Sequence, residues 1–142
     1  MTKLLRDQSG AAAIEAAFAL PILILLIYGI FQVGVAFQAS AGMQHALGEG
    51  ARYATLFPEP DNDLIKTRIQ SKVFGVGVGS FSEPTVTNQC ETSGPNVCAS
   101  GTNSSYKDLS VTFTMTPNFL FFTGPQIALT RTKRVYTAGR IT

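Results

Sequence analysis

The stretch from Gly10 to Phe37, GAAAIEAAFALPILILLIYGIFQVGVAF, decides how the rest of the chain is arranged. No Asp, Glu, Lys or Arg occurs between Glu15 and Glu49, and residues 16–37 are almost wholly apolar. Twenty-two residues of helix extend about 33 Å, which is enough to cross a hydrocarbon core of about 30 Å. The sequence therefore predicts a helix over residues 11–57, with a membrane span at about residues 16–37.

The charges on either side of this span predict its orientation. Lys3 and Arg6 precede it, whereas the first charged residue after it is Glu49. Positively charged flanks stay on the cytoplasmic side. We therefore expect Met1 in the cytoplasm and residues 58–142 as an exported domain.

A cleaved secretory signal is the rival interpretation, because Ala39-Ser40-Ala41 resembles a signal-peptide cleavage site. A soluble secreted binding module would then be released after Ala41. The apolar run is longer than the usual signal core of about 7 to 15 residues. The helical pattern also continues past the proposed cut, at Met43, Leu47, Ala51 and Ala54.

Glu15 places a carboxylate at the start of the apolar helix. An ionisable group inside a membrane is by default a functional hypothesis, because burying it costs about 2.5 to 3.5 kcal/mol on insertion scales. Near the first turn, however, the positive end of the helix dipole stabilises an acidic side chain. On position alone the two interpretations are balanced, and the spacing from Gly10 favours the functional one.

Gly10 is followed by Ala11, three more apolar residues and Glu15, after a short basic leader. This is the pattern of a prepilin processing site. The wider stretch Gly10–Ala54, with Pro21 and the closing EGARYA, resembles the TadE-like pseudopilins of tight-adherence (Flp-type) pili. In that family the residue after the Glu is often aromatic and a later helix position is often acidic, whereas this chain has Ala16 and Gln32.

The resemblance implies that a membrane prepilin peptidase removes residues 1–10, a cytoplasmic leader, and leaves Ala11 as the new N-terminus. It also implies that Glu15 serves assembly by meeting the N-terminal amine of a neighbouring subunit. The implied location is the bacterial inner membrane, with the exported domain in the periplasm or on a pilus. The implied partners are other pilins and pseudopilins, an inner-membrane assembly platform and a secretion ATPase, with no cofactor. Chains of this size are usually minor components of the fibre.

The helix also contains pairs of small residues that favour close helix packing in lipid. The pairs are Ala12 with Ala16, Ala13 with Ala17, and Ala36 with Ser40. Pro21 removes the helical hydrogen bond to the carbonyl of Ala17, which predicts a kink or a local loosening. The alternative is a proline that a membrane helix simply tolerates.

The exported domain has the pattern of an α+β fold: a short helix followed by a small antiparallel sheet. Asp61 or Asn62 can cap a helix over DLIKTRIQSKVF. The expected core-facing residues of that helix are Leu64, Ile65, Ile69 and Phe74. The glycines of GVGVGS, residues 75–80, predict a flexible connection rather than a phosphate-binding loop.

Three segments predict strands: SEPTVTNQC, YKDLSVTFTMTP and QIALTRTKRVYT. In the second, alternation places one apolar set on the core face, namely Leu109, Val111, Phe113 and Met115. The segment NFLFFTG, residues 118–124, carries the phenylalanines of the Phe119 to Phe122 cluster. A core plug is the favoured interpretation of this cluster, with a contact to another subunit or to the membrane as the alternative.

Cys90 and Cys98 both fall in the exported domain, with loop-forming residues between them. In an oxidising compartment they predict a disulfide, which would contribute about 2 to 3 kcal/mol. A metal site would need more ligands, and His45, the only histidine, lies on the helix.

The remaining features disfavour other functions. The net charge of +2 gives no general footprint for nucleic acid, and the basic cluster Arg131, Lys133, Arg134 and Arg140 is expected to be a solvated strand end. No constellation of catalytic side chains occurs at an informative spacing, so an enzyme is not expected. Three predictions remain open: a processed pseudopilin or minor pilin, an uncleaved, single-pass membrane protein whose β domain binds an envelope partner, and the soluble secreted binding module released after Ala41.

Overall fold

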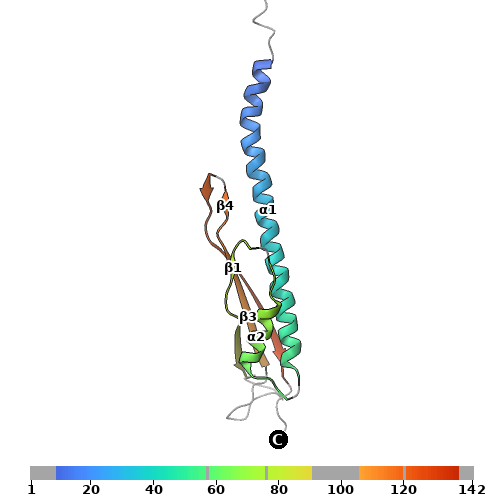
Figure 1. Ribbon diagram of the computed structural model, residues 1–142. Coiled ribbons are helices and arrows are strands. Elements are labelled where there is room, and N and C mark those ends of the chain that lie inside the picture. The colour runs from blue at the N-terminus through green and yellow to red at the C-terminus, as the bar shows by residue number, and fades with distance from the viewer. Residues whose placement is uncertain (1–8, 57, 76, 91–105, 120, 138–142) are drawn as a thin grey trace, which may run out of the picture.

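A computed structural model of the chain describes residues 9–56, 58–75, 77–90, 106–119 and 121–137. It consists of a long helical rod with a small domain attached along one half (Figure 1). The helices are α1 (Ser9–Ala54) and α2 (Asn62–Lys72). The strands are β1 (Ser80–Phe81), β2 (Thr85–Gln89), β3 (Tyr106–Met115), β4 (Asn118–Phe119), β5 (Phe122–Thr123) and β6 (Ile127–Tyr136). The predicted α+β class is confirmed.

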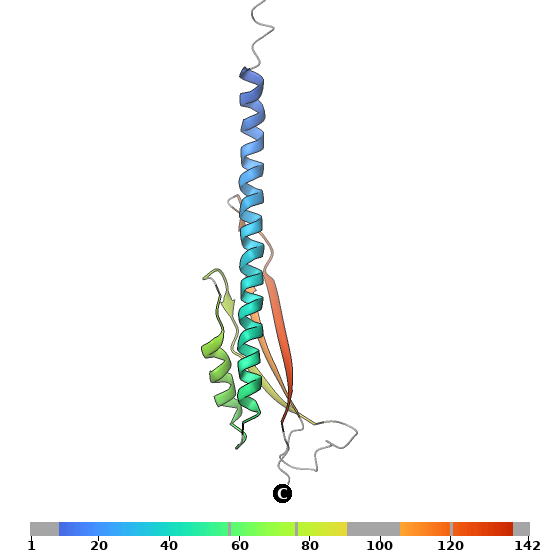
Figure 2. The same ribbon diagram turned by 90° about the vertical axis from the view of Figure 1, so that its right-hand side faces the viewer.

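The helix α1 has two halves with different surroundings. Residues 10–31 are exposed, except for the half-buried Leu25 and Gly29, and Gln32 is the first buried residue. After Gln32 a buried stripe recurs at helical spacing along one face: Val35, Ala39, Met43, Ala46, Leu47, Ala51 and Ala54. The predicted continuation of the helix through Met43, Leu47, Ala51 and Ala54 is therefore confirmed, and this half packs against both α2 and the sheet (Figure 2).

The sheet is built around β3. Strand β6 pairs antiparallel with the whole length of β3, from Tyr106 opposite Tyr136 to Met115 opposite Ile127. The short strands β1 and β2 pair with β3 on its other edge, so the far edge of β6 pairs with no strand in the described ranges. The predicted alternation holds, because the set Leu109, Val111, Phe113 and Met115 is at most 3% exposed.

Helix α2 covers the lower part of the core. Asp61 is its N-cap, and the Asp61 carboxylate accepts a hydrogen bond of 2.7 Å from the backbone N–H of Asn62. Ile65 and Ile69 are fully buried, as predicted, whereas Leu64 is 54% exposed and its predicted core position is wrong. Leu64 lies about 100° around the helix from Ile65 and falls outside the buried stripe that Ile65 and Ile69 form.

The predicted core position of Phe74 is also wrong, because its side chain is 49% exposed. Helix α2 ends at Lys72, and the chain then turns extended at Val73. Val73 packs against the core in place of Phe74. The Phe74 ring instead lies against the ring of His45, with 5.7 Å between the ring centroids.

Two glycines of α1 allow the neighbouring segments to approach closely. A Cβ atom at Gly42 would overlap the backbone carbonyl of Phe74, and one at Gly50 would overlap the side chain of Ile69. Gly34, in the same helix, has no heavy atom within 4 Å of that position. Gly42 and Gly50 weaken the isolated helix, but the close packing of the neighbouring segments leaves no room for a side chain at either position.

Lys107 is a buried cation at the end of the core face of β3. Its side chain is 5% exposed, and Nζ lies 2.9 Å from Oε1 of Glu59. Nζ also donates hydrogen bonds of 2.8 Å to Oδ1 of Asn62 and 2.9 Å to Oδ1 of Asn88. Lys107 therefore joins the loop after α1, the start of α2 and strand β2, with all three donors of the ammonium group used.

The Phe119 to Phe122 cluster does not plug the core, so the favoured prediction is wrong. Strands β4 and β5 form a small antiparallel hairpin in which Phe119 faces Phe122. Phe121 is 74% exposed and Phe122 is 58% exposed. The hairpin lies beside the middle of α1, past the end of the main sheet, where the core does not extend (Figure 1).

We expect Gly42→Ala to lower the free energy of unfolding by about 1 to 3 kcal/mol, because the new methyl group meets rigid backbone. Gly34→Ala is the matched control in the same helix. It should leave stability unchanged or raise it by up to about 1 kcal/mol through helix propensity. Denaturation of the detergent-solubilised chain, followed by tyrosine fluorescence, measures both. Equal effects of the two substitutions would contradict the close approach.

Lys107→Met should lower the free energy of unfolding by about 1 to 3 kcal/mol, because Glu59 loses its ion-pair partner and the half-buried Asn62 loses the donor to its side-chain oxygen. Lys133→Met removes an exposed lysine from the neighbouring strand and should change stability by about 0.5 kcal/mol or less. The same denaturation measurement separates them. A Lys107→Met variant as stable as the parent would show that the buried cation is dispensable.

Candidate assembly surface and junction pocket

The predicted processing, assembly and helix-packing residues lie in the exposed half of α1, except the pair Ala36 and Ser40, which faces the sheet domain of its own chain. Those in the exposed half are Gly10, Ala11, Ala12, Ala13, Glu15, Ala16, Ala17 and Pro21, and every one of them is exposed. The fold brings none of them together with the sheet domain. Large apolar side chains surround them on all sides of the helix, including Ile14, Phe18, Leu20, Ile22 and Leu23. An apolar helix surface of this extent requires lipid or another protein around it.

Glu15 lies on this surface among short side chains. Positions four residues before and after it are Ala11 and Ala19, and the position three before it is Ala12. These are its neighbours on a helix surface. Because a helical side chain leans toward the N-terminus, the Glu15 carboxylate extends over the turn that contains Ala11 and Ala12. Phe18, three residues after Glu15, is the one large neighbour, and the alanine side of the carboxylate is open to a second chain.

Pro21 lies inside α1, and the helix continues through it from Ser9 to Ala54. The residues around Pro21 are exposed, so this turn has no packing partner within the described part of the chain. The predicted helix is thus continuous across the proline. The structure describes no other helix that is long and apolar enough to cross a membrane.

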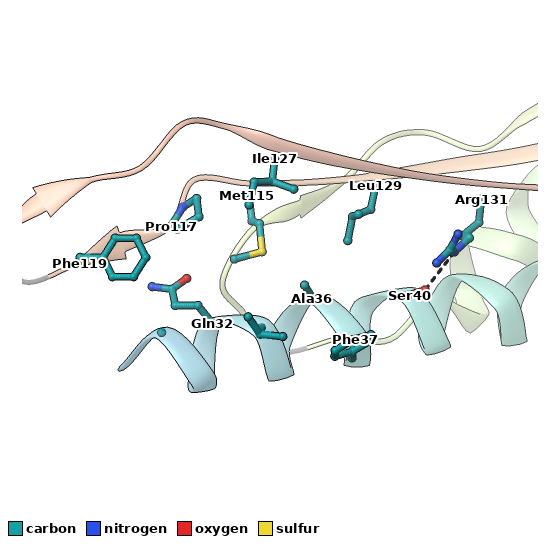
Figure 3. Close-up of a pocket in the computed structure, with 12 residues that line it drawn as sticks. Gln32, Ala36, Phe37, Ser40, Met115, Pro117, Phe119, Ile127, Leu129 and Arg131 are labelled. Carbon is teal, nitrogen blue, oxygen red and sulfur yellow. Dashed lines mark hydrogen bonds between the residues drawn. The ribbon is translucent and has the colours of Figure 1, made fainter. Parts of the chain in front are cut away.

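A pocket of about 320 Å³ lies where the exposed half of α1 meets the sheet domain. We call it the junction pocket. Its walls are apolar residues of α1, the end of β3, the hairpin and the start of β6 (Figure 3). They include Val33, Ala36, Phe37, Met115, Phe119 and Leu129.

Two polar contacts mark the ends of the junction pocket (Figure 3). At one end Nε2 of Gln32 donates a hydrogen bond of 3.1 Å to the backbone carbonyl of Asn118, which ties the hairpin to α1. At the other end Nε of Arg131 donates a hydrogen bond of 3.0 Å to Oγ of Ser40. Oε1 of Gln32 is buried and has no donor among the described residues.

Sequence reasoning missed the structural role of Gln32. It was noted only as the residue that replaces a common acidic residue of the family. The available signal was a lone amide in an apolar run, because a buried amide needs a hydrogen-bond partner. The partner is a backbone carbonyl 86 positions away along the chain, which no local pattern indicates.

The predicted basic cluster is divided between the two faces of the sheet. Arg131 faces α1, whereas Arg134 lies on the opposite face and forms two hydrogen bonds to Asp108, of 2.9 and 3.1 Å. The Arg134 guanidinium also lies 4.0 Å from the centre of the Tyr106 ring. The hydrogen bonds to Asp108 raise the pKa of Arg134 above its usual value. Arg140 lies outside the described residues.

The predicted disulfide between Cys90 and Cys98 stays a prediction, because Cys98 lies outside the described residues. Cys90 is the last described residue before that gap and directly follows β2. Within the described ranges, no three His, Cys, Asp or Glu side chains come together in a way that could hold a metal ion.

Residues 10–52 match the family model described as TadE-like protein. The match confirms the resemblance that the sequence indicated, and it is nearly coextensive with α1. It supports a pilin-like role in the tight-adherence system and a single-pass membrane anchor. No curated protein and no solved structure matches the chain.

We expect Gln32→Leu to loosen the hairpin without unfolding the domain. The substitution removes the hydrogen bond to Asn118 but also removes the unpaired oxygen, so the change in global stability should be small. The loss of about 1 kcal/mol locally corresponds to about five-fold faster amide hydrogen exchange in residues 118–124. Ser40→Ala removes the other polar contact of the pocket and should leave that exchange rate unchanged. Equal exchange rates in the parent and in Gln32→Leu would contradict a stabilising role for the hydrogen bond between Gln32 and Asn118.

Proposed function

We propose that the chain is a TadE-like pseudopilin or minor pilin of the tight-adherence system, with a structural rather than an enzymatic role. One observation carries the proposal: the half of α1 that contains the prepilin-like pattern is apolar all round and exposed over residues 10–31. This half has almost no contact with the rest of its own chain. In the membrane, lipid covers it, and in a fibre, the helices of neighbouring subunits take the place of lipid.

The proposal includes removal of residues 1–10 by a prepilin peptidase. The bond between Gly10 and Ala11 lies at the start of α1, where both residues are exposed. The glycine adds no side chain that would obstruct a protease active site. Cleavage creates an amine at the end of the helix, next to the turn over which the Glu15 carboxylate extends.

Glu15 then acts as the anionic partner for the amine on Ala11 of a neighbouring subunit. In lipid each charge alone is costly, and a partner of opposite sign offsets the desolvation of both. The alanines around Glu15 permit the close backbone approach that such a pair requires. Assembly on a platform with a secretion ATPase follows from the family resemblance.

The structure favours this proposal over a secreted module released after Ala41. Such a cut would remove Val35 and Ala39 from the core, together with the Gln32 and Ser40 contacts to the sheet domain. The second candidate, an uncleaved single-pass protein that binds an envelope partner, keeps every contact of the described fold. Unlike the proposed pseudopilin, this protein would keep Met1 as its N-terminus, and its function would not require Glu15.

Intact mass of the chain purified from membranes and from sheared pili separates the three forms. We expect a chain that begins at Ala11. A chain that begins at Met1 in functional pili would contradict processing, and one that begins at Gly42 would show release of a secreted module.

Glu15→Val should abolish or strongly reduce piliation while the chain still inserts into the membrane, because valine removes the partner of the N-terminal amine but keeps the helix apolar. Glu83→Gln is the control, since it neutralises an exposed carboxylate outside the helix. Complementation of a strain that lacks the chain, scored by the amount of sheared pilus and by the membrane content of the variant, measures both effects. Unchanged piliation by Glu15→Val would refute the assembly role.

A further inference from the structure

The β4–β5 hairpin lies at the level of α1 where exposure ends. Nε2 of Gln32 bonds the backbone of Asn118, and a Cβ at Gly29 would lie 3.9 Å from Cε1 of Phe119. Residues 10–31 of α1, the part without a protein cover, would span about 33 Å, close to the thickness of a hydrocarbon core. The hairpin therefore lies beside the exported-side end of this uncovered part of α1, residues 10–31.

The chemistry of the hairpin fits the boundary of a bilayer. Residues 116–126 contain no Asp, Glu, Lys, Arg or His. Phe121 is 74% exposed and Phe122 is 58% exposed, and the rings of Phe119 and Phe122 stack with their centroids 4.9 Å apart. Phe, like Trp and Leu, forms the apolar face with which interfacial segments enter the boundary between headgroups and acyl chains. Val33 of α1, which is 55% exposed, lines the junction pocket together with Phe119 of the hairpin, so the two apolar surfaces meet there.

The nearest cation on β6 fits the same placement. Arg131 is anchored to Ser40, which lies eight residues beyond Gln32 and so about 12 Å farther along the helix axis. The headgroup layer adds about 5 to 8 Å on each side of the hydrocarbon core. The guanidinium, held at Ser40, therefore lies beyond the headgroup layer, and the shallow placement of the hairpin leaves this charge outside the hydrocarbon core.

We infer that the β4–β5 hairpin is a second membrane contact, which inserts Phe121 and Phe122 at the boundary between hydrocarbon and headgroups of the exported-side leaflet. The occupant is the phospholipid bilayer that already surrounds α1. Insertion is shallow, because the backbone of a two-stranded hairpin needs water or headgroups for its unpaired hydrogen-bonding groups. The contact holds the sheet domain against the membrane before assembly. This inference rests on the membrane anchoring in the proposed function.

The chain contains no tryptophan, so one introduced tryptophan reports its own surroundings. The full-length chain carrying Phe121→Trp is reconstituted into vesicles of phosphatidylethanolamine and phosphatidylglycerol. We expect a blue-shifted emission, quenching by lipids brominated near the headgroup end of the acyl chain, and loss of quenching by aqueous iodide.

Two matched variants complete the experiment. Phe74→Trp changes another exposed phenylalanine, beside Gly42 and about 15 Å beyond Gln32 along the axis, and should be quenched by iodide. Phe18→Trp lies in the exposed half of α1 and should be quenched by brominated lipid. If brominated lipid does not quench the Phe18→Trp emission, membrane anchoring itself is refuted, and the hairpin contact is refuted with it.

With Phe18→Trp quenched as expected, iodide quenching of Phe121→Trp would overturn the hairpin contact alone. Protection of Phe121→Trp from both quenchers, increasing with the protein-to-lipid ratio, would also overturn it. That result would identify a second copy of the chain, rather than lipid, as the cover of the hairpin.

Discussion

The packing of the second half of α1 against β3 and α2 is the contact on which the whole structure depends. The buried stripe of α1 meets the buried face of β3, where Phe113 is fully buried. Because one helix without a break forms both the core of the domain and the exposed rod, the domain cannot turn independently of the rod. A force applied to the exposed half therefore reaches the sheet through a close-packed core and not through a linker.

Local patterns predicted the parts of the fold that depend on periodicity. The helix expected over residues 11–57 is α1, and the alternation of Leu109 to Met115 is the core face of β3. Local patterns failed where segments distant in sequence meet. The close approaches at Gly42 and Gly50, the three partners of Lys107 and the tie from Gln32 to Asn118 all depend on tertiary contacts that no window of sequence contains.

The candidate site shows the same division between local and distant information. Gly10, Ala11 and Glu15 are singled out by spacing alone, because their own fold leaves them exposed and their proposed partners are other molecules. The phenylalanine cluster was assigned to the core because small domains usually bury such residues. The hairpin that carries it extends past the end of the sheet, where the domain offers only the wall of the junction pocket, and composition cannot indicate that position.

The free edge of β6 has a consequence for storage in a crowded membrane. The far edge of this ten-residue strand pairs with no strand in the described ranges, which invites pairing with the same edge of another copy, and the proposed anchoring in one orientation would bring such edges to a common height. The strand carries Arg131, Lys133 and Arg134, all exposed. Like charges brought opposite one another repel, which disfavours edge-to-edge pairing of two copies.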